Sequence, residues 1–361
     1  MSKVLFNSLK ATTLAAALVL TTGSFVLAKT VPLKGLLANE RLWSDYKHRF
    51  LDKSGRIIDN ANKNISHSEG QGFSMLMAVA ANDRKAFDRI WKFTKDNMMV
   101  RRDNLVAWRW SPRGFKRVTD KNNATDGDIM IAWALLEAHE AGFSDNYRRS
   151  ALEILRDVKK LLRNDKYFGT FMLPGAKWFT GEHNKGKDII NLSYWVFPAL
   201  ERLAVLTGDA TWTKVAASGE KLIWSASNNR AGLPPDWSGL RRHKGEVEFA
   251  PKFSKEFSYN AIRVPLYLAW SSQNRSTSLN RFHKNWISRE GGLSQVDVRW
   301  NRTKGAFQEQ GYHAVAAVVN CSLAGSAFPQ NLRTTLDKNY YPASLHLLSI
   351  IATKQRYPQC W

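Results

Sequence analysis

Residues 68–76 read SEGQGFSML and form the most informative short pattern in the chain. Glu69 lies between a serine and two glycines, and apolar residues at helical spacing follow it directly. Gly70 and Gly72 remove side-chain bulk, so a large ligand could approach the Glu69 carboxylate closely. A carboxylate here can also simply cap the helix, because a helix N-terminus favours negative charge. The pattern predicts a helix and leaves a catalytic and a capping role for Glu69 open.

The composition is that of a globular protein and argues against disorder. Of 361 residues, 44% are hydrophobic and 23% are charged. The 14 tryptophans exceed the needs of the core, and surplus tryptophan can line a groove that stacks on sugar rings. The net charge of +22 is typical of chains that meet nucleic acid, anionic membranes or acidic polymers. The basic residues are scattered and no nucleic-acid motif accompanies them, so we interpret them as a solvated surface and predict no nucleic-acid partner.

The N-terminus has the pattern of a targeting segment. Lys3 and Lys10 precede an apolar run at 11–20, and small residues lead to Ala28. This pattern predicts a signal peptide at 1–28 and a periplasmic or secreted protein. This apolar run is shorter than the roughly 20 residues that a helix needs to span a membrane. An uncleaved membrane anchor is the alternative. No later segment resembles a span, so we predict no stable membrane span after processing.

The chain has two cysteines, Cys321 and Cys360. In an oxidising compartment they could pair and hold the C-terminal tail. Neither has the spacing to histidine that structural zinc sites show. We therefore predict no metal site and no cofactor.

Helical periodicity recurs in pairs along the chain, without a run of alternating strands. The expected helices cover 35–52, 69–81, 84–98, a segment opening at 123–128, 147–162, 191–207, 211–228, 258–270, 276–287, 312–325 and 340–355. Polar residues stand repeatedly at helix starts, at Glu69, Asp126, Tyr194 and Asn260. If the paired helices close into a ring, these starts gather at one mouth. Spacing alone leaves an open helical array as the alternative.

Three motifs, in this order, resemble the signature stretches of glycoside hydrolase family 8. They read SEGQG at 68–72, ATDGD at 124–128 and SYNAIR at 258–263. Within the family, the chain is most similar to secreted cellulases of bacterial cellulose-synthesis systems. The resemblance implies an all-α fold, an (α/α)6 barrel with an open substrate cleft, in one catalytic domain at 29–361. It also implies inverting hydrolysis of a β-1,4-glucan, with the cellulose-synthesis machinery as a further candidate partner.

An inverting glycosidase needs one carboxylic acid to protonate the leaving oxygen and a second carboxylate, about 6.5–9.5 Å away, to activate water. By resemblance, Glu69 is the proton donor and Asp126 orients the sugar at the bond being cut, or takes a more direct catalytic part. Tyr194 and Arg263 match residues near the cleaved sugar, although Arg263 could also be an ion-paired core residue. Trp108, Trp110 and Tyr259 are candidate sugar-stacking side chains, with plain packing as the alternative.

Asn260 departs from the family pattern, because many members carry an aspartate there as the general base. A neutral amide cannot take a proton at ordinary pH. The loop at 232–257 could supply another base from Asp236, Glu246, Glu248 or Glu256. Glu256 and Glu248 are the preferred candidates, with a solvated loop charge as the alternative for each. Otherwise the enzyme is slow, with Asn260 only positioning water, or the protein binds glycan without cutting it. The sequence thus predicts an exported endo-β-1,4-glucanase acting on cellulose, with a glycan-binding or weakly active accessory protein of cellulose biosynthesis as the alternative.

Overall fold

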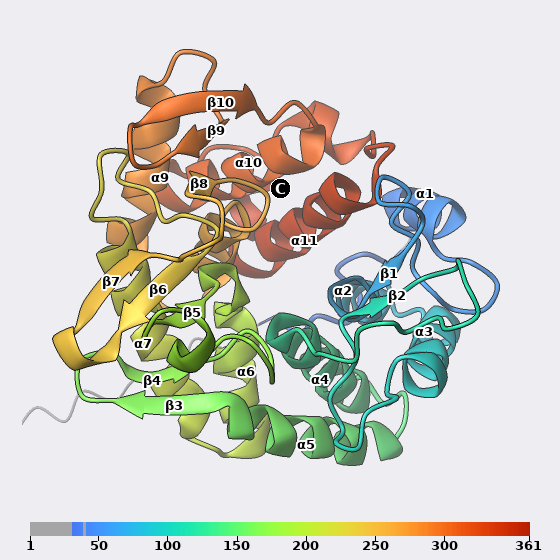
Figure 1. Cartoon of the computed structure of the whole chain (residues 1–361). Coiled ribbons are helices and arrows are strands. Elements are labelled where there is room, and N and C mark those ends of the chain that lie inside the picture. The colour runs from blue at the N-terminus through green and yellow to red at the C-terminus, as the bar shows by residue number, and fades with distance from the viewer. Residues whose placement is uncertain (1–30, 39–40) are drawn as a thin grey trace, which may run out of the picture.

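Helices dominate the computed structural model of the chain (Figure 1), which describes residues 31–38 and 41–361. The predicted signal peptide lies outside the described residues. The helices are α1 (Arg41–Phe50), α2 (Ser68–Ala80), α3 (Arg84–Asn97), α4 (Thr125–Glu140), α5 (Asn146–Val158), α6 (Phe197–Thr207), α7 (Thr211–Ala226), α8 (Arg263–Trp270), α9 (Ser276–Ser288), α10 (Gln310–Ala324) and α11 (Tyr340–Arg356). Within the described ranges, no helix is both long and apolar enough to cross a membrane.

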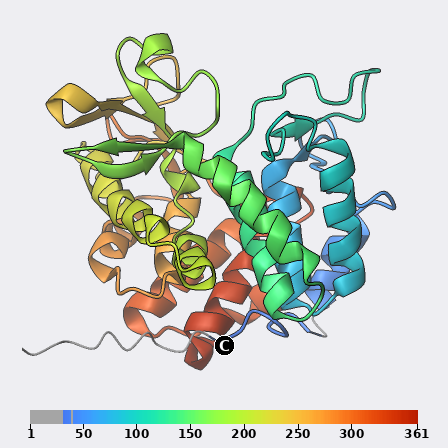
Figure 2. The ribbon, with the colours of Figure 1, turned by 90° about the horizontal axis from the view of Figure 1, so that it is seen from below.

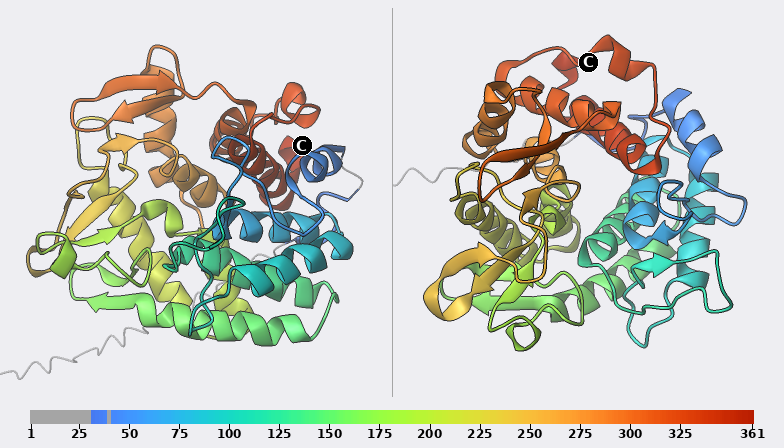
Figure 3. Two further views of the ribbon diagram at one scale, coloured as in Figure 1. Left: turned by 45° about the vertical axis from the view of Figure 1, so that its right-hand side comes forward. Right: turned by 45° about the horizontal axis from the view of Figure 1, so that its top comes forward.

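Six of the helices form a closed inner ring. Around it, α2 contacts α4, followed by α6, α8, α10 and α11, and α11 returns to α2 (Figure 3). Helix α4 is buried continuously from Thr125 to Ala138, and α2 and α11 are buried along nearly their whole length. A helix of this kind needs neighbours on every side, which the outer helices α1, α3, α5, α7 and α9 provide. The predicted (α/α)6 barrel is confirmed, and closure of the ring rules out the open array.

The glycines beside Glu69 allow close packing of the ring helices. A Cβ on Gly72 would lie 2.6 Å from Met130 Cβ on α4, and one on Gly127 would collide with the Ser68 hydroxyl. A Cβ on Gly70 would lie 2.5 Å from the Tyr340 hydroxyl. The space at Gly70 and Gly72 is thus filled by neighbouring protein groups, which differs from the expected role of admitting a ligand.

In the part of the chain that the structure describes, ten short strands form four small antiparallel sheets, which the sequence did not predict. They are β1 (Ser66–His67) with β2 (Arg109–Trp110); β3 (Leu162–Asp165) with β4 (Gly169–Met172); β5 (Asp188–Ile190), β6 (Ser238–Arg241) and β7 (Glu246–Phe249); and β8 (Glu256–Phe257), β9 (Ser294–Asp297) and β10 (Arg302–Ala306). Each has two to five residues, too few for a clear alternation of polar and apolar positions. The strands and long loops gather toward one end of the helical ring (Figure 2).

Two inner helices begin later than predicted, and both shifts affect the site. A 3-10 turn at Leu192–Tyr194 precedes α6, because the Asn191 side chain accepts a hydrogen bond from Ser193 N. Asp236 similarly accepts from Ser258 N (3.0 Å) and Ala261 N (2.8 Å) and holds the turn before α8. Tyr194 and Asn260 therefore lie in turns rather than in helices.

The two cysteines form a disulfide between the last part of α10 and the C-terminal tail. Cys321 and Cys360 are 39 positions apart in the sequence, and both are buried. The pairing that the sequence left open is thus present, and the cross-link ties the tail to the ring.

Replacing both cysteines with serine should lower the free energy of unfolding by about 2–4 kcal/mol, because the cross-link restricts the unfolded chain. Urea unfolding of wild type and variant, each with and without a thiol reductant, measures the difference. Reductant should destabilise only the wild type. Equal stability of all four samples would contradict the prediction.

Candidate active site

A cavity of about 710 Å³ lies where the inner helices begin. Each of the six helix starts contributes a lining side chain. They are Glu69 on α2, Asp126 on α4, Tyr194 before α6, Arg263 on α8, Glu309 before α10 and Tyr340 on α11. Helix N-termini carry partial positive charge, so their convergence stabilises carboxylates at this mouth.

Arg263 joins the polar groups of the cavity. Its Nη1 contacts the Glu69 carboxylate and donates to Asp126 Oδ2 at 2.9 Å. Its Nη2 donates to Ser193 Oγ at 2.7 Å and to Asn260 Oδ1 at 2.9 Å. The Arg263 side chain is only 2% exposed, and a buried charge needs such partners. Arg263 is therefore both an ion-paired buried residue and a part of the cavity wall.

Two carboxylates share this one guanidinium. The Asp126 side chain is 3% exposed and that of Glu69 is 18% exposed, so Glu69 is the more accessible of the two. Burial raises the pKa of Asp126 to about 7; Arg263 opposes the increase and the charge of Glu69 adds to it. The site therefore retains a proton more readily than an exposed carboxylate does.

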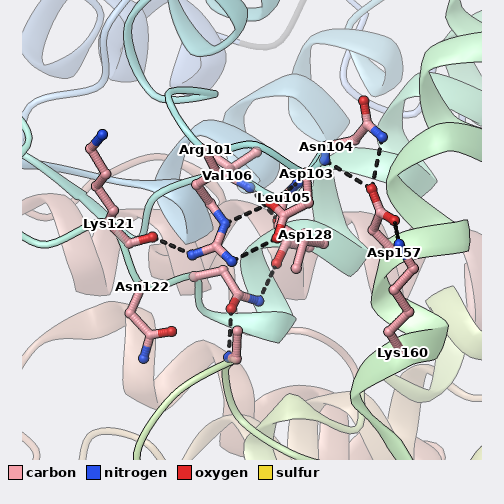
Figure 4. A network of polar contacts seen from close by, with 12 residues as sticks. Arg101, Asp103, Asn104, Leu105, Val106, Lys121, Asn122, Asp128, Asp157 and Lys160 are labelled. Atoms are coloured by element: carbon pink, nitrogen blue, oxygen red, sulfur yellow. Dashed lines mark hydrogen bonds and ion pairs between the residues drawn. The ribbon is translucent and has the colours of Figure 1, made fainter.

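Asp128 faces away from the cavity and has a structural role. Its Oδ1 accepts from Val106 N at 2.8 Å, and its Oδ2 accepts from Asn123 Nδ2 at 2.7 Å. Figure 4 shows these contacts within a polar network around Arg101. Asp128 thus anchors neighbouring chain segments to α4, while Asp126, two residues earlier, lines the cavity.

The orientation of the Asn260 amide follows from its hydrogen bonds. Ser193 N can only donate, so its bond to Asn191 Oδ1 (3.1 Å) makes Asn191 Nδ2 the donor to Asn260 Oδ1 (3.1 Å). Arg263 donates to the same oxygen. Among the residues that the structure describes, none accepts a hydrogen bond from Asn260 Nδ2. Asn260 therefore turns N–H donors, and no basic atom, toward the cavity that it lines.

Two of the three candidate sugar-stacking side chains, Trp108 and Tyr259, line the cavity together with Tyr194. Trp108 is held by a hydrogen bond from its Nε1 to Asp120 Oδ2 (2.8 Å), and Tyr259 is 50% exposed. These positions suit contact with a ligand. The third candidate, Trp110 on β2, does not line the cavity and lies in edge contact with Phe93.

Residues 25–355 match the family described as glycosyl hydrolases family 8. The chain belongs to this family. A probable endoglucanase of Novacetimonas hansenii is 35% identical over 314 residues, which are 86% of this chain and 89% of that protein. The structure of the endoglucanase Cel10 of Klebsiella pneumoniae is similar with a TM-score of 0.80 and 34% identity, covering 87% of this chain and 99% of that one. The endo-β-1,4-glucanase CMCax of Acetobacter xylinum has a TM-score of 0.79 and 33% identity, covering 90% and 99%.

A second cavity of about 520 Å³ lengthens the cleft of this family 8 protein. It shares Trp108, Ala124 and Tyr194 with the first cavity. Its wall includes Trp237 and the 65% exposed Trp178, which the sequence analysis did not select. The unusual number of tryptophans was the only signal for them. Together the two cavities form an aromatic-lined trough.

Neither of the two preferred loop glutamates, Glu248 and Glu256, lies in the trough beside Glu69. Glu248 on β7 forms ion pairs with Lys187 and with Arg241 (3.0 Å), and it lines a separate depression. These cations hold the pKa of Glu248 below its usual range. Glu256 on β8 pairs in register with Asp297 and also does not line the Glu69 cavity. Strand pairing directs the loop so that neither glutamate lies with Glu69.

We expect the free energy of unfolding of this family 8 protein to fall as pH rises from about 5 to about 8. Burial raises the pKa of Asp126 to about 7 and that of Asp128 to about 8, from ordinary values of 3.8. In this range the folded state binds more protons than the unfolded state, so rising pH favours unfolding. Urea unfolding at several pH values measures the slope. Asp126→Asn, which cannot titrate, should show a smaller decrease, and an unchanged slope would contradict this assignment.

Proposed function

We propose that this protein is an exported endo-β-1,4-glucanase that hydrolyses cellulose with inversion, and that Glu69 is its general acid. The observation that carries the proposal is the position of Glu69. It is the more accessible of two carboxylates on Arg263, in the wall of an open trough. The endoglucanase names of the relatives in Novacetimonas and Klebsiella support the same activity.

In this mechanism Glu69 donates its proton to the bridging oxygen, while water attacks the anomeric carbon from the opposite face. Asp126, fixed by Arg263 and by Gly127 N (2.8 Å), binds hydroxyl groups of the sugar at the cleaved bond. Asn260 donates a hydrogen bond to the attacking water and positions it. Sugar rings stack on Trp108, Tyr194 and Tyr259.

The shape of the trough favours internal cleavage of a polymer. The first cavity continues past Trp108 and Tyr194 into the second, so sugar units can extend beyond the cleavage point. Aromatic side chains suit the apolar faces of β-linked glucose units. The positive net charge of +22 disfavours a cationic polymer such as chitosan.

The mature chain should release reducing sugar from carboxymethylcellulose, and viscosity should fall early, as internal cleavage requires. Xylan and chitosan serve as comparison polymers. Proton NMR of the first cellooligosaccharide products should show the α-anomer, which inversion of a β-linkage yields. Initial formation of the β-anomer would contradict inversion, and preferential cleavage of xylan or chitosan would contradict the proposed substrate.

A second candidate function is glycan binding with weak or no cleavage, as an accessory protein of cellulose biosynthesis. The donor orientation of the Asn260 amide favours it, because the usual base is absent at that place. Export and contact with cellulose-synthesis machinery belong to both proposals and rest on the N-terminal sequence pattern and the resemblance.

Cell fractionation with and without residues 1–28 tests export: loss of the segment should retain the protein in the cytoplasm.

A further inference from the structure

The cavity needs a group that can take a proton from water, since Asn260 offers only donors. We propose that Glu309 is this proton acceptor, an inference that rests on the proposed hydrolytic function. Glu309 immediately precedes α10 and lines the same cavity as Glu69. It is neither part of the three sequence motifs nor close to them in the sequence.

The other carboxylates of the cavity wall are already engaged. Asp59 Oδ2 lies 2.9 Å from His67 Nε2, and its Oδ1 accepts from Ala61 N at 3.2 Å. Asp126 accepts from Arg263 and from the backbone of α4, and Glu69 contacts the same guanidinium. Among the described residues, the Glu309 carboxylate has no hydrogen bond or ion pair. Its lone pairs are therefore available to a water in the cavity.

The Glu309 side chain is also not used to cap α10, although its position at the start of that helix suggests this role. It is the N-cap residue of α10, and an N-cap side chain commonly accepts from the first backbone N–H groups of its helix. Here Asp337 takes that role, because its carboxylate accepts from Gln310 N at 3.0 Å and from Gly311 N at 2.7 Å. The Glu309 side chain makes no capping bond and is left for the cavity.

The ring order places Glu309 on the side of Asn260. In the closed ring, α8 lies between α6 and α10 and also contacts α11, so it has no direct contact of this kind with α2. Helix α10 is the neighbour of α8. One turn after Glu309, the Tyr312 ring lies 6.0 Å from that of Tyr259, the residue before Asn260. Glu309 thus lines the cavity from the helix next to the one that Asn260 precedes.

Asn260 and Glu309 together perform the function of the usual general base. Asn260 donates to the oxygen of the attacking water and holds it, while one water hydrogen points to Glu309. The water oxygen forms the bond to the anomeric carbon as the glycosidic bond breaks. The water proton passes to Glu309, and the leaving oxygen takes the proton of Glu69. The products are two shorter glucans, and one proton exchange with solvent restores both carboxyl groups.

Glu309→Gln should lower kcat on carboxymethylcellulose by a factor of roughly 10²–10⁴, the usual contribution of a general base, with little change in KM. Azide needs no deprotonation, so it should restore turnover in Glu309→Ala and yield a glycosyl azide. The double variant Asn260→Asp/Glu309→Gln should regain activity, because Arg263 and Asn191 would hold the new carboxylate as they hold the amide. If Glu309 had only a structural role, neither azide nor the Asn260→Asp substitution would restore activity.

Glu153→Gln, at an exposed glutamate on α5, is the matched control and should behave as wild type. Circular dichroism and cellooligosaccharide binding establish that the Glu309 variants are folded. Full activity of Glu309→Gln beside an active wild type would overturn the Glu309 inference alone. An inactive wild type that becomes active only with Asn260→Asp would also overturn it. Inactivity of both wild type and Asn260→Asp on every glucan would overturn the proposed function as well.

Discussion

Replacing Glu69 with glutamine should lower kcat on carboxymethylcellulose by a factor of roughly 10²–10⁴, since glutamine has nearly the same shape and no proton to donate. The amide oxygen of the introduced glutamine can still accept from Arg263, so the fold and sugar binding should persist. Reducing-sugar release and cellooligosaccharide binding measure the two effects separately.

The nature of the leaving group gives a sharper test of the acid role. A dinitrophenyl cellooligosaccharide has a leaving group that needs little protonation, so Glu69→Gln should cleave it far better than it cleaves carboxymethylcellulose. Glu153→Gln, on the exposed face of α5, controls for the loss of a negative charge. Equal losses on both substrates would assign Glu69 a role other than proton donation, and unchanged activity would exclude it from the chemistry.

Replacing Arg263 with methionine should abolish activity and lower the free energy of unfolding at pH 8 by about 3–5 kcal/mol, as loss of one partner of a buried ion pair does. Glu69 and Asp126 would then face each other without a positive charge, and the Asn260 amide oxygen would lose one of its two donors. At pH 5 the loss of stability should be smaller, because the buried Asp126 can be protonated there.

The double variant Arg263→Met/Asp126→Asn should recover part of the stability at pH 8, because one of the two uncompensated charges is gone. Arg41→Met is the matched control, since the Arg41 side chain is 86% exposed. Its stability should match that of wild type at both pH values. An Arg263→Met protein as stable as wild type at pH 8 would mean that the ion pairs do not support the helix starts.

Most helices could be predicted because apolar periodicity is a local property of the chain. The helices expected at 84–98, 211–228 and 340–355 lie within two residues of α3, α7 and α11. The starts of α6 and α8 were placed too early. Their preceding turns depend on hydrogen bonds to Asn191 and Asp236, and the second of these crosses more than twenty positions in the sequence.

The residues of the candidate site also differ in whether a local sequence pattern could identify them. Glu69, Asp126 and Arg263 stand in motifs at or near helix starts, so the sequence could select them, and the structure brings them together. Glu248 and Glu256 were selected for their closeness to Asn260 along the chain. Ion pairing holds Glu248 elsewhere, strand pairing positions Glu256 outside the cavity, and neither effect is visible in a local pattern.

Local patterns in the chain were enough to predict most helices, the chemistry of the three motifs and the lack of a basic atom at Asn260. Which carboxylates share a cavity depends on the folded chain, and folding brings Glu309 into the wall that holds Glu69. This is because the cavity forms only when six helices close into a ring. Contacts between α11 and α2 join segments that are far apart in the sequence and close the ring, so that the helix starts meet at one mouth.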